Sequence, residues 1–242
     1  MTAPRGAGSR WIRRLPWVLS ILGPIVWLAL IAYSQVNETG FMRITEEDHL
    51  VENAQSLLFF VGAMLAGWIA WALGRRRRIG WVALYMLLAV GLGYLAGEEI
   101  SWGQRIFQIE TPGWFLAHHN NQDEMNLHNL PEVQHVTRKL FNRAVKTVTL
   151  LTLIGWMAGL RRRPRWQARL WVPHPALLPS WVAIWSYQWL RQLYKWRYQA
   201  DSVSKVMARL HEAYELVLAL AIVAGLLFVW EAVRQDDAPR AS

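Results

Sequence analysis

Apolar runs and short charged segments alternate along the whole chain. Six runs approach the ~20 residues that a helix needs to cross ~30 Å of hydrocarbon. They lie at about 15–34, 54–73, 79–95, 144–160, 176–190 and 213–233. The fifth run is the weakest, because it is short and Pro179 interrupts it. The pattern predicts an all-α fold, a polytopic membrane helical bundle of about six transmembrane helices.

The arginines set the expected orientation of this bundle. Four precede the first run, four lie together at 75–78, and five more lie at 161–169. Because Lys and Arg are retained on the cytoplasmic side, these segments and both termini are expected in the cytoplasm. Segments 35–53, 96–143 and 191–212 are then outside. We expect a multi-pass protein of a bacterial inner membrane.

The first run follows a basic patch, as the apolar core of a signal peptide does. It is long for such a core, however, and no small-x-small cleavage site follows it. We therefore expect an uncleaved first helix. Residues 1–234 are expected to form one bundle, with 235–242 as a disordered tail.

The predicted outer loop at 96–143 is long for a simple connection. Loops of this length are often ordered and functional. We expect a structured loop with short helices at the outer leaflet, anchored by Trp102, Phe107, Trp114 and Phe115.

Composition supports a membrane protein and removes other classes. The chain is 54% hydrophobic and has 16 tryptophans. Its formal charge of +9 does not indicate nucleic-acid binding, because the basic residues lie in short blocks between apolar runs. Membrane lipids are the expected partners, and the sequence identifies no protein partner. The absence of cysteine excludes disulfides, thiolate metal sites and cysteine nucleophiles.

Acids and histidines collect on the predicted outer face. With the arginine blocks in the cytoplasm, 14 of the 17 Asp and Glu residues and six of the seven histidines fall outside. Acids contribute little to topology, so the positive-inside rule does not account for this distribution. Carboxylates and imidazoles gathered at one membrane surface are typical of a metal or proton-handling site.

Two of the four segments that carry these residues adjoin the second and third runs. Asp48 and Glu52 are four residues apart and share one helix face; alternatively, they only cap the helix through its macrodipole. Glu98 and Glu99 follow directly on an apolar run, where a carboxylate is costly unless it is paired, protonated or bound to a cation. Their alternative role is an interfacial pair with Arg105 that ends the helix.

The other two segments have His–Glu pairs at helical spacing. Glu124 and His128, with Asn126 between them, could reach one ion from one helical turn, or could belong to a polar surface loop. His211 and Glu215 have the same spacing, and Glu215 lies inside the last apolar run. A histidine at an interface is otherwise simply solvated.

Together the four segments predict a polar pocket at the outer mouth of the bundle. Carboxylate oxygens with imidazole suit a divalent metal, zinc first among them. The sequence has no G-x-S-x-G, H-E-x-x-H, Walker A or Gly-rich dinucleotide motif, which removes the enzyme classes that depend on them.

Two strings carry a resemblance to a known family. They are Gly-Glu-Glu-Ile-Ser-Trp-Gly-Gln-Arg-Ile-Phe at 97–107 and Gln-Asp-Glu-Met-Asn-Leu-His-Asn at 122–129. They look like the signature of an uncharacterised bacterial family of multi-pass membrane proteins, and the resemblance spans most of the chain. It implies a helical membrane bundle and no particular activity.

A fainter resemblance is to the alkaline ceramidase and adiponectin-receptor superfamily of membrane hydrolases. In that group an acidic segment with Glu and Asn precedes an early helix, a Ser–His pair lies on a middle helix, and an H-x-x-x-H motif opens the last helix. The residues that fall in a similar order here are Asp48, Glu52 and Asn53, then Ser101, then His211 and Glu215. This chain departs from that group in having Glu215 in place of a second histidine, no histidine soon after Ser101, and six predicted helices rather than seven.

The leading hypothesis is a metal-dependent hydrolase of a lipid or lipid-linked ester or amide at the outer leaflet. In it Glu124, His128, His211 and Glu215 are the candidate ligands. Glu98 or Glu99 is the general base, and Arg105 holds a phosphate or the oxyanion. Asp48, Glu52 and Asn126 support the ligands or form a separate cation site.

Two other functions remain open. The chain could be a non-enzymatic accessory or assembly subunit of a membrane complex, or a proton- or cation-coupled transporter. The transporter is ranked last, because carriers usually place ionisable residues near the midplane. An enzyme requires the four segments to converge and to be shielded from water, whereas a docking surface would leave them spread and exposed.

Overall fold

The computed structural model describes residues 7–46, 49–117, 127, 131–157, 170, 172–198 and 205–236. About 90% helix and no strand are found in these residues. The helices are α1 (Ala7–Val36), α2 (Glu38–Ile44), α3 (Leu50–Gly74), α4 (Ile79–Glu99), η1 (Ser101–Gly103), α5 (Gln104–Phe107), α6 (Gly113–Ala117), α7 (Pro131–Met157), η2 (Pro175–Leu177), α9 (Leu178–Tyr198) and α10 (Lys205–Asp236). The predicted all-α fold is confirmed.

Four of these helices are long and apolar enough to cross a membrane. They are α1, from Arg14 onward, α3, α4 and α10. Helices α7 and α9 do not meet that criterion, because basic residues interrupt the first half of α7 and the last turns of α9. The structure therefore supports a membrane protein with four candidate spans rather than the six that the apolar runs predicted.

Several helices extend beyond the apolar run that predicted them. Helix α7 begins at Pro131 rather than at 144, and α10 begins at Lys205 rather than at 213. The predicted fifth helix ended at 190, but α9 continues to Tyr198. Hydropathy detects only the apolar part of a helix, so polar turns that continue it are missed. Segment 96–143 accordingly contains η1, α5, α6 and the start of α7.

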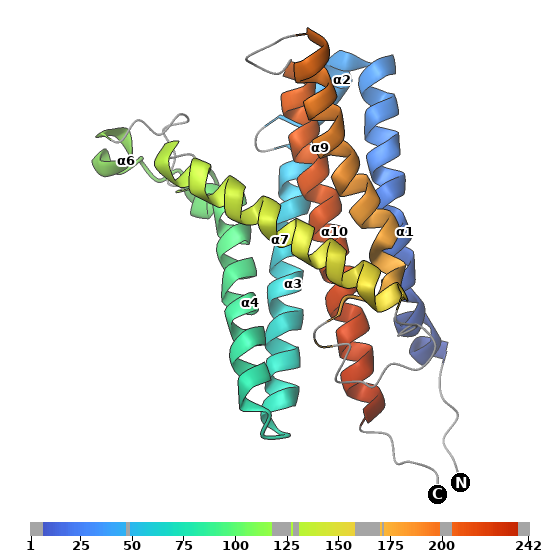
Figure 1. The fold of residues 1–242 in the computed structure, drawn as a ribbon. Helices are drawn as coiled ribbons and strands as arrows, with labels where there is room; N and C mark the ends of the chain where they lie inside the picture. The colour runs from blue at the N-terminus through green and yellow to red at the C-terminus, as the bar shows by residue number, and fades with distance from the viewer. Residues whose placement is uncertain are drawn as a thin grey trace, which may run out of the picture.

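Helix α10 lies at the centre of the bundle. Within its apolar stretch 67% of the residues are buried, against 17% for α4. It packs against α1, α3 and α9 and contributes to both hydrophobic clusters of the core. Helix α4 packs on α3, and α7 crosses the bundle obliquely with its contacts on α9 and η2 (Figure 1).

Side-chain hydrogen bonds join neighbouring helices within the apolar core. The Trp27 indole donates to Ser186 Oγ at 2.7 Å, which links α1 to α9. Ser56 Oγ donates to the Ala96 carbonyl at 2.8 Å, which links α3 to α4. Such bonds between membrane helices contribute about 0.6 kcal/mol each on average, and they fix the helices in register.

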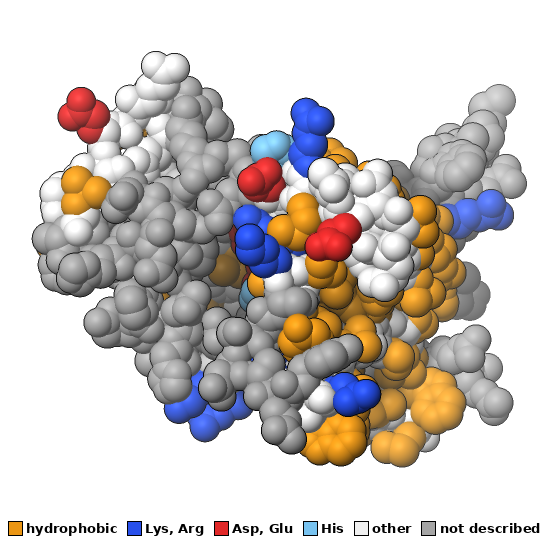
Figure 2. Space-filling view, turned by 90° about the horizontal axis from the view of Figure 1, so that it is seen from above, with side chains coloured by type: hydrophobic (Ala, Val, Ile, Leu, Met, Phe, Trp, Pro, Cys, Tyr) orange, Lys and Arg blue, Asp and Glu red, His pale blue; other side chains and the backbone are white. Residues whose placement is uncertain are grey.

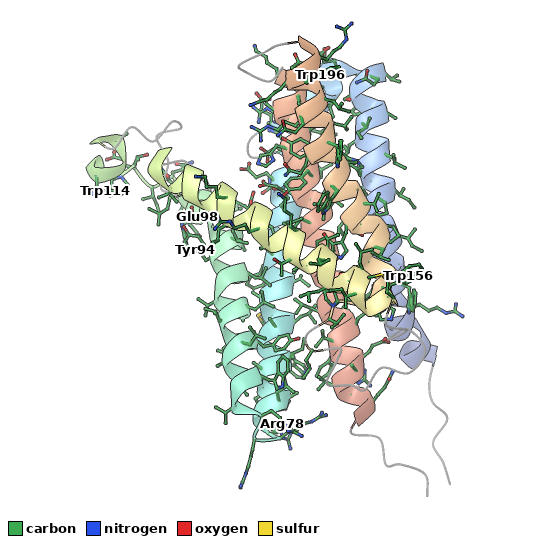
Figure 3. The ribbon with its side chains drawn as sticks, viewed as in Figure 1. Arg78, Tyr94, Glu98, Trp114, Trp156 and Trp196 are labelled. Carbon is green, nitrogen blue, oxygen red and sulfur yellow. The ribbon has the colours of Figure 1, made fainter. Side chains whose placement is uncertain are left out.

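The two ends of the bundle differ in charge. Helix α1 begins, and α10 ends, at the same end as the arginine turn at 75–78 (Figures 1 and 3). We call this the basic end. The opposite end, where α3 begins and α4 stops, contains Glu52, Glu98, Glu99 and His211 and is called the acidic end.

Candidate acidic site between α3, α4 and α10

Helix α3 brings a carboxylate and an amide to the acidic end. Glu52 lies in its first turn and Gln55 lies three residues further, on the same side. Gln55 is fully buried, and its side-chain nitrogen donates to the Glu212 carbonyl at 2.5 Å. This bond ties α3 to α10 at the level of Glu52.

Helix α4 ends in two adjacent carboxylates with different surroundings. Glu98 is 3% exposed. Its Oε1 accepts a hydrogen bond from the Trp102 indole at 2.7 Å, and its Oε2 accepts one from the Leu127 backbone N–H at 2.7 Å. The Tyr94 side chain also bonds to it. Glu98 is thus a buried anchor that holds the chain after α4 and the segment at Leu127 together.

A left-handed turn makes the bond between Glu98 and Trp102 possible. Ser101, Trp102 and Gly103 have φ values of +46°, +55° and +76°. Two of these residues are not glycine, and left-handed backbone is strained for them. The turn folds the Trp102 ring back onto α4, where a Cβ on Gly97 would lie 2.8 Å from it. The Gly-Glu-Glu-Ile-Ser-Trp-Gly string is therefore one packed unit, which we call the Glu98 turn.

Glu99, the next residue of α4, lies among further carboxylates. It is close enough to interact electrostatically with four other carboxylates. The strength of the interaction decreases in the order Glu215, Glu212, Glu52 and Glu98. Five carboxylates from three helices therefore meet here, and we call them the carboxylate cluster. Like charges this close repel one another unless a cation or shared protons offset part of the charge.

The His211 imidazole is held beside this cluster by aromatic rings. Its Nε2 lies 3.5 Å from Glu215 Oε1. Its ring stacks on Tyr187 of α9 and Tyr214 of α10, with centroid distances of 5.6 and 5.4 Å. Both tyrosines are buried, so the position of the imidazole is set by two helices rather than by one exposed turn.

The structure brings together most of the predicted site residues that it describes. Glu52, Glu98, Glu99, His211 and Glu215 converge between α3, α4 and α10. Asp48, Glu124, Asn126 and His128 lie outside the described residues, as does the Arg105 side chain. Leu127, which lies between Asn126 and His128 in the sequence, donates its backbone N–H to Glu98, so the chain reaches the site at this one described residue.

Sequence reasoning missed several residues that shape the site. Gln55 could have been noticed as a polar residue one turn after Glu52 inside an apolar run. Tyr187 and Trp102 gave no such signal, because aromatic residues occur throughout this chain. Gln55 also has an unusual feature: its buried Oε1 has no hydrogen-bond donor among the described residues. A buried acceptor of this kind favours a cation or a donor nearby.

The view onto the acidic end shows its mixed chemistry. In Figure 2, Asp or Glu, Lys or Arg and His side chains gather over the helix ends, beside an apolar flank. Within the described part of the chain, no group of three or more His, Asp and Glu side chains is arranged to hold a metal ion. Two of the four predicted ligands, Glu124 and His128, lie outside the described residues.

Comparisons with known proteins found no match to this chain. No protein-family model matches the chain, and no curated protein or solved structure is similar to it. The functional interpretation therefore depends on the site itself.

Proposed function

We propose that this protein is an integral membrane enzyme of a bacterial inner membrane, with its acidic end outside and α7 and α9 completing six crossings. Its reaction is hydrolysis of an ester or amide in a lipid or lipid-linked substrate, with a divalent cation, zinc first, at the carboxylate cluster. One observation supports this most: carboxylates from three helices converge and are at least partly shielded from water. A docking surface would leave them spread and exposed.

The residues at the cluster fit a divalent cation in two respects. His211 and Glu215 present an imidazole and a carboxylate together, and the unpaired Oε1 of Gln55 lies at the same contact between α3 and α10. Glu124 and His128 would complete the ligand set from either side of Leu127. When bound, the cation supplies Lewis acidity for attack of water on a carbonyl.

The two carboxylates of α4 take different roles in this proposal. Glu98 is occupied by Trp102 and Leu127, so it positions the outer segment. Glu99 faces the other carboxylates and is therefore the better general base. Arg105 remains the proposed partner of a substrate phosphate or oxyanion, and Glu52 supports the cluster from α3, with Asp48 and Asn126.

Metal content gives the first test. We expect about one divalent metal per chain in detergent-purified protein prepared without chelators, measured by inductively coupled plasma mass spectrometry. The double variant His211→Ala/Glu215→Gln should lose it, because both ligands lie on one face of α10. Glu38→Gln, an exposed carboxylate on α2, serves as the matched control and should retain the metal. Metal-free wild-type protein would contradict a metal-dependent mechanism.

An activity assay tests Glu99 as the general base. On a panel of lipid esters and amides, Glu99→Gln should lower kcat about 100-fold or more while metal content stays unchanged, because only the base is removed. The assay follows released fatty acid. Full activity of Glu99→Gln, in protein that retains its metal, would rule out Glu99 as the base.

A further inference from the structure

A second arrangement of side chains lies at the basic end, far from the carboxylate cluster. Helices α3 and α10 end with the same pattern, a tryptophan followed four residues later by an arginine. The Arg75 guanidinium lies 5.2 Å from the centre of the Trp71 ring, and that of Arg234 lies 6.0 Å from Trp230. Each arginine thus stacks on the indole of the preceding turn.

Trp68 joins the two pairs. Its ring lies 5.2 Å from that of Trp71 and 6.1 Å from that of Trp230. Helices α3 and α10 pack together and both run toward the basic end, and Arg76 Nη2 donates to the Val233 carbonyl at 2.7 Å. The two arginines therefore flank one seam. We call Trp68, Trp71, Arg75, Trp230 and Arg234 the Trp–Arg clamp.

An apolar stripe leads along α3 to the clamp. Leu57, Phe60, Met64, Trp68 and Trp71 follow one another at three- or four-residue steps, and all are more than half exposed. The other sides of α3 pack on α4 and α10. Because α3 is a candidate span, this stripe faces the hydrocarbon of the membrane, and Arg75 lies at its end on the side of the headgroups.

The charge at this end is strongly positive. The arginines at 75–78 and Arg234 contribute five positive charges, whereas Glu231 and Asp236 are the acids on the last turns of α10. Arg75 and Arg234 are exposed. A guanidinium above an indole face can still present an N–H edge to a ligand, and that edge matches two oxygens of a phosphate.

We propose that the Trp–Arg clamp binds one anionic phospholipid. The phosphate lies at Arg75 and Arg234, the indoles lie at the level of the glycerol, and an acyl chain follows the stripe on α3. The order of the groups along the protein matches the order of the parts of such a lipid. The apolar stripe corresponds to the acyl chain, the tryptophans to the glycerol and the two arginines to the phosphate. Free phosphate would use only the arginines. This site is independent of the proposed hydrolysis at the opposite end.

The test compares lipids and arginines on the protein in an uncharged detergent. We expect phosphatidylglycerol to raise the melting temperature, and to remain bound in native mass spectrometry, at concentrations where phosphatidylcholine with the same chains does neither. Arg75→Gln/Arg234→Gln should weaken this binding about tenfold or more. Both residues are exposed, so the variant should fold. Arg75→Lys keeps the charge but loses the two-pronged N–H edge of the guanidinium, and should also weaken binding.

The matched control removes the same charge from the same end. Arg14→Gln/Arg77→Gln changes two exposed arginines for which no indole stack is found in the described residues; it should alter binding less than about twofold. Equal losses in the two double variants would mean that only net charge attracts the lipid. That outcome would overturn the clamp. Full stabilisation by glycerol phosphate alone would overturn the assignment to a lipid.

Discussion

Glu98→Ala is expected to destabilise the acidic end more than the loss of any other single carboxylate. The substitution removes the buried acceptor of the Trp102 indole and of the Leu127 N–H, two partly buried hydrogen bonds. Hydrogen bonds to charged groups contribute ~1.5–3 kcal/mol each, so the loss of two should lower the free energy of unfolding by about 3–6 kcal/mol. Thermal unfolding in detergent should then begin about 10 °C lower.

Glu99→Ala is the matched comparison, because it removes the neighbouring carboxylate. Glu99 faces four other carboxylates, so its loss relieves repulsion and should leave the melting temperature unchanged or higher. Trp102→Phe removes one of the donors to Glu98 and should give an intermediate loss. Equal destabilisation by Glu98→Ala and Glu99→Ala would show that Glu98 is not the anchor of the outer segment.

Gly97→Ala is expected to have the second large effect. The new methyl group would lie 2.8 Å from the Trp102 ring, which the hydrogen bond to Glu98 and the left-handed turn hold in place. Overpacking of this kind costs ~1–3 kcal/mol, even though alanine is the better helix former. Thermal unfolding of the purified variant measures the loss.

A control for this change lies on the same helix. A methyl group added at Gly91 would meet no atom of the described residues within 4 Å, so Gly91→Ala should stabilise α4 slightly. In a Trp102→Ala background the cost of Gly97→Ala should disappear, because the clash has been removed. Persistence of the full cost in that background would place its origin outside the Glu98 turn.

The helices could be located from the sequence because their apolar runs are long. The first residues of α7 and α10 could not be located in this way. In α10, His211 and Glu212 interrupt the hydropathy, yet the helix continues through them, since His211 stacks on Tyr187 and the Glu212 backbone bonds to Gln55. Tertiary contacts of this kind leave no periodic signal in a short polar stretch.

The sequence indicated that acidic segments would lie at one end of the bundle. It did not indicate which carboxylate has which role there. Glu98 and Glu99 are adjacent, so sequence alone could not say which faces the cluster. The bond between Trp102 and Glu98 depends on left-handed backbone at Ser101 and Trp102, a conformation that non-glycine residues rarely adopt. Gln55 enters the site through a contact with α10, which is distant from it in the sequence, and Tyr187 enters through ring contacts with the same helix.

The central position of α10 also governs the order in which the protein can be built. Both hydrophobic clusters include residues of α10, yet this helix follows all the other described helices in the chain. During synthesis, α1 and α3 therefore enter the membrane with the faces that will meet α10 still covered by lipid. Glu52 and Glu99 are likewise without Glu212 and Glu215 until α10 has been added. The carboxylate cluster is complete only once α10 has been added, so a chain interrupted before α10 lacks His211, Glu212 and Glu215.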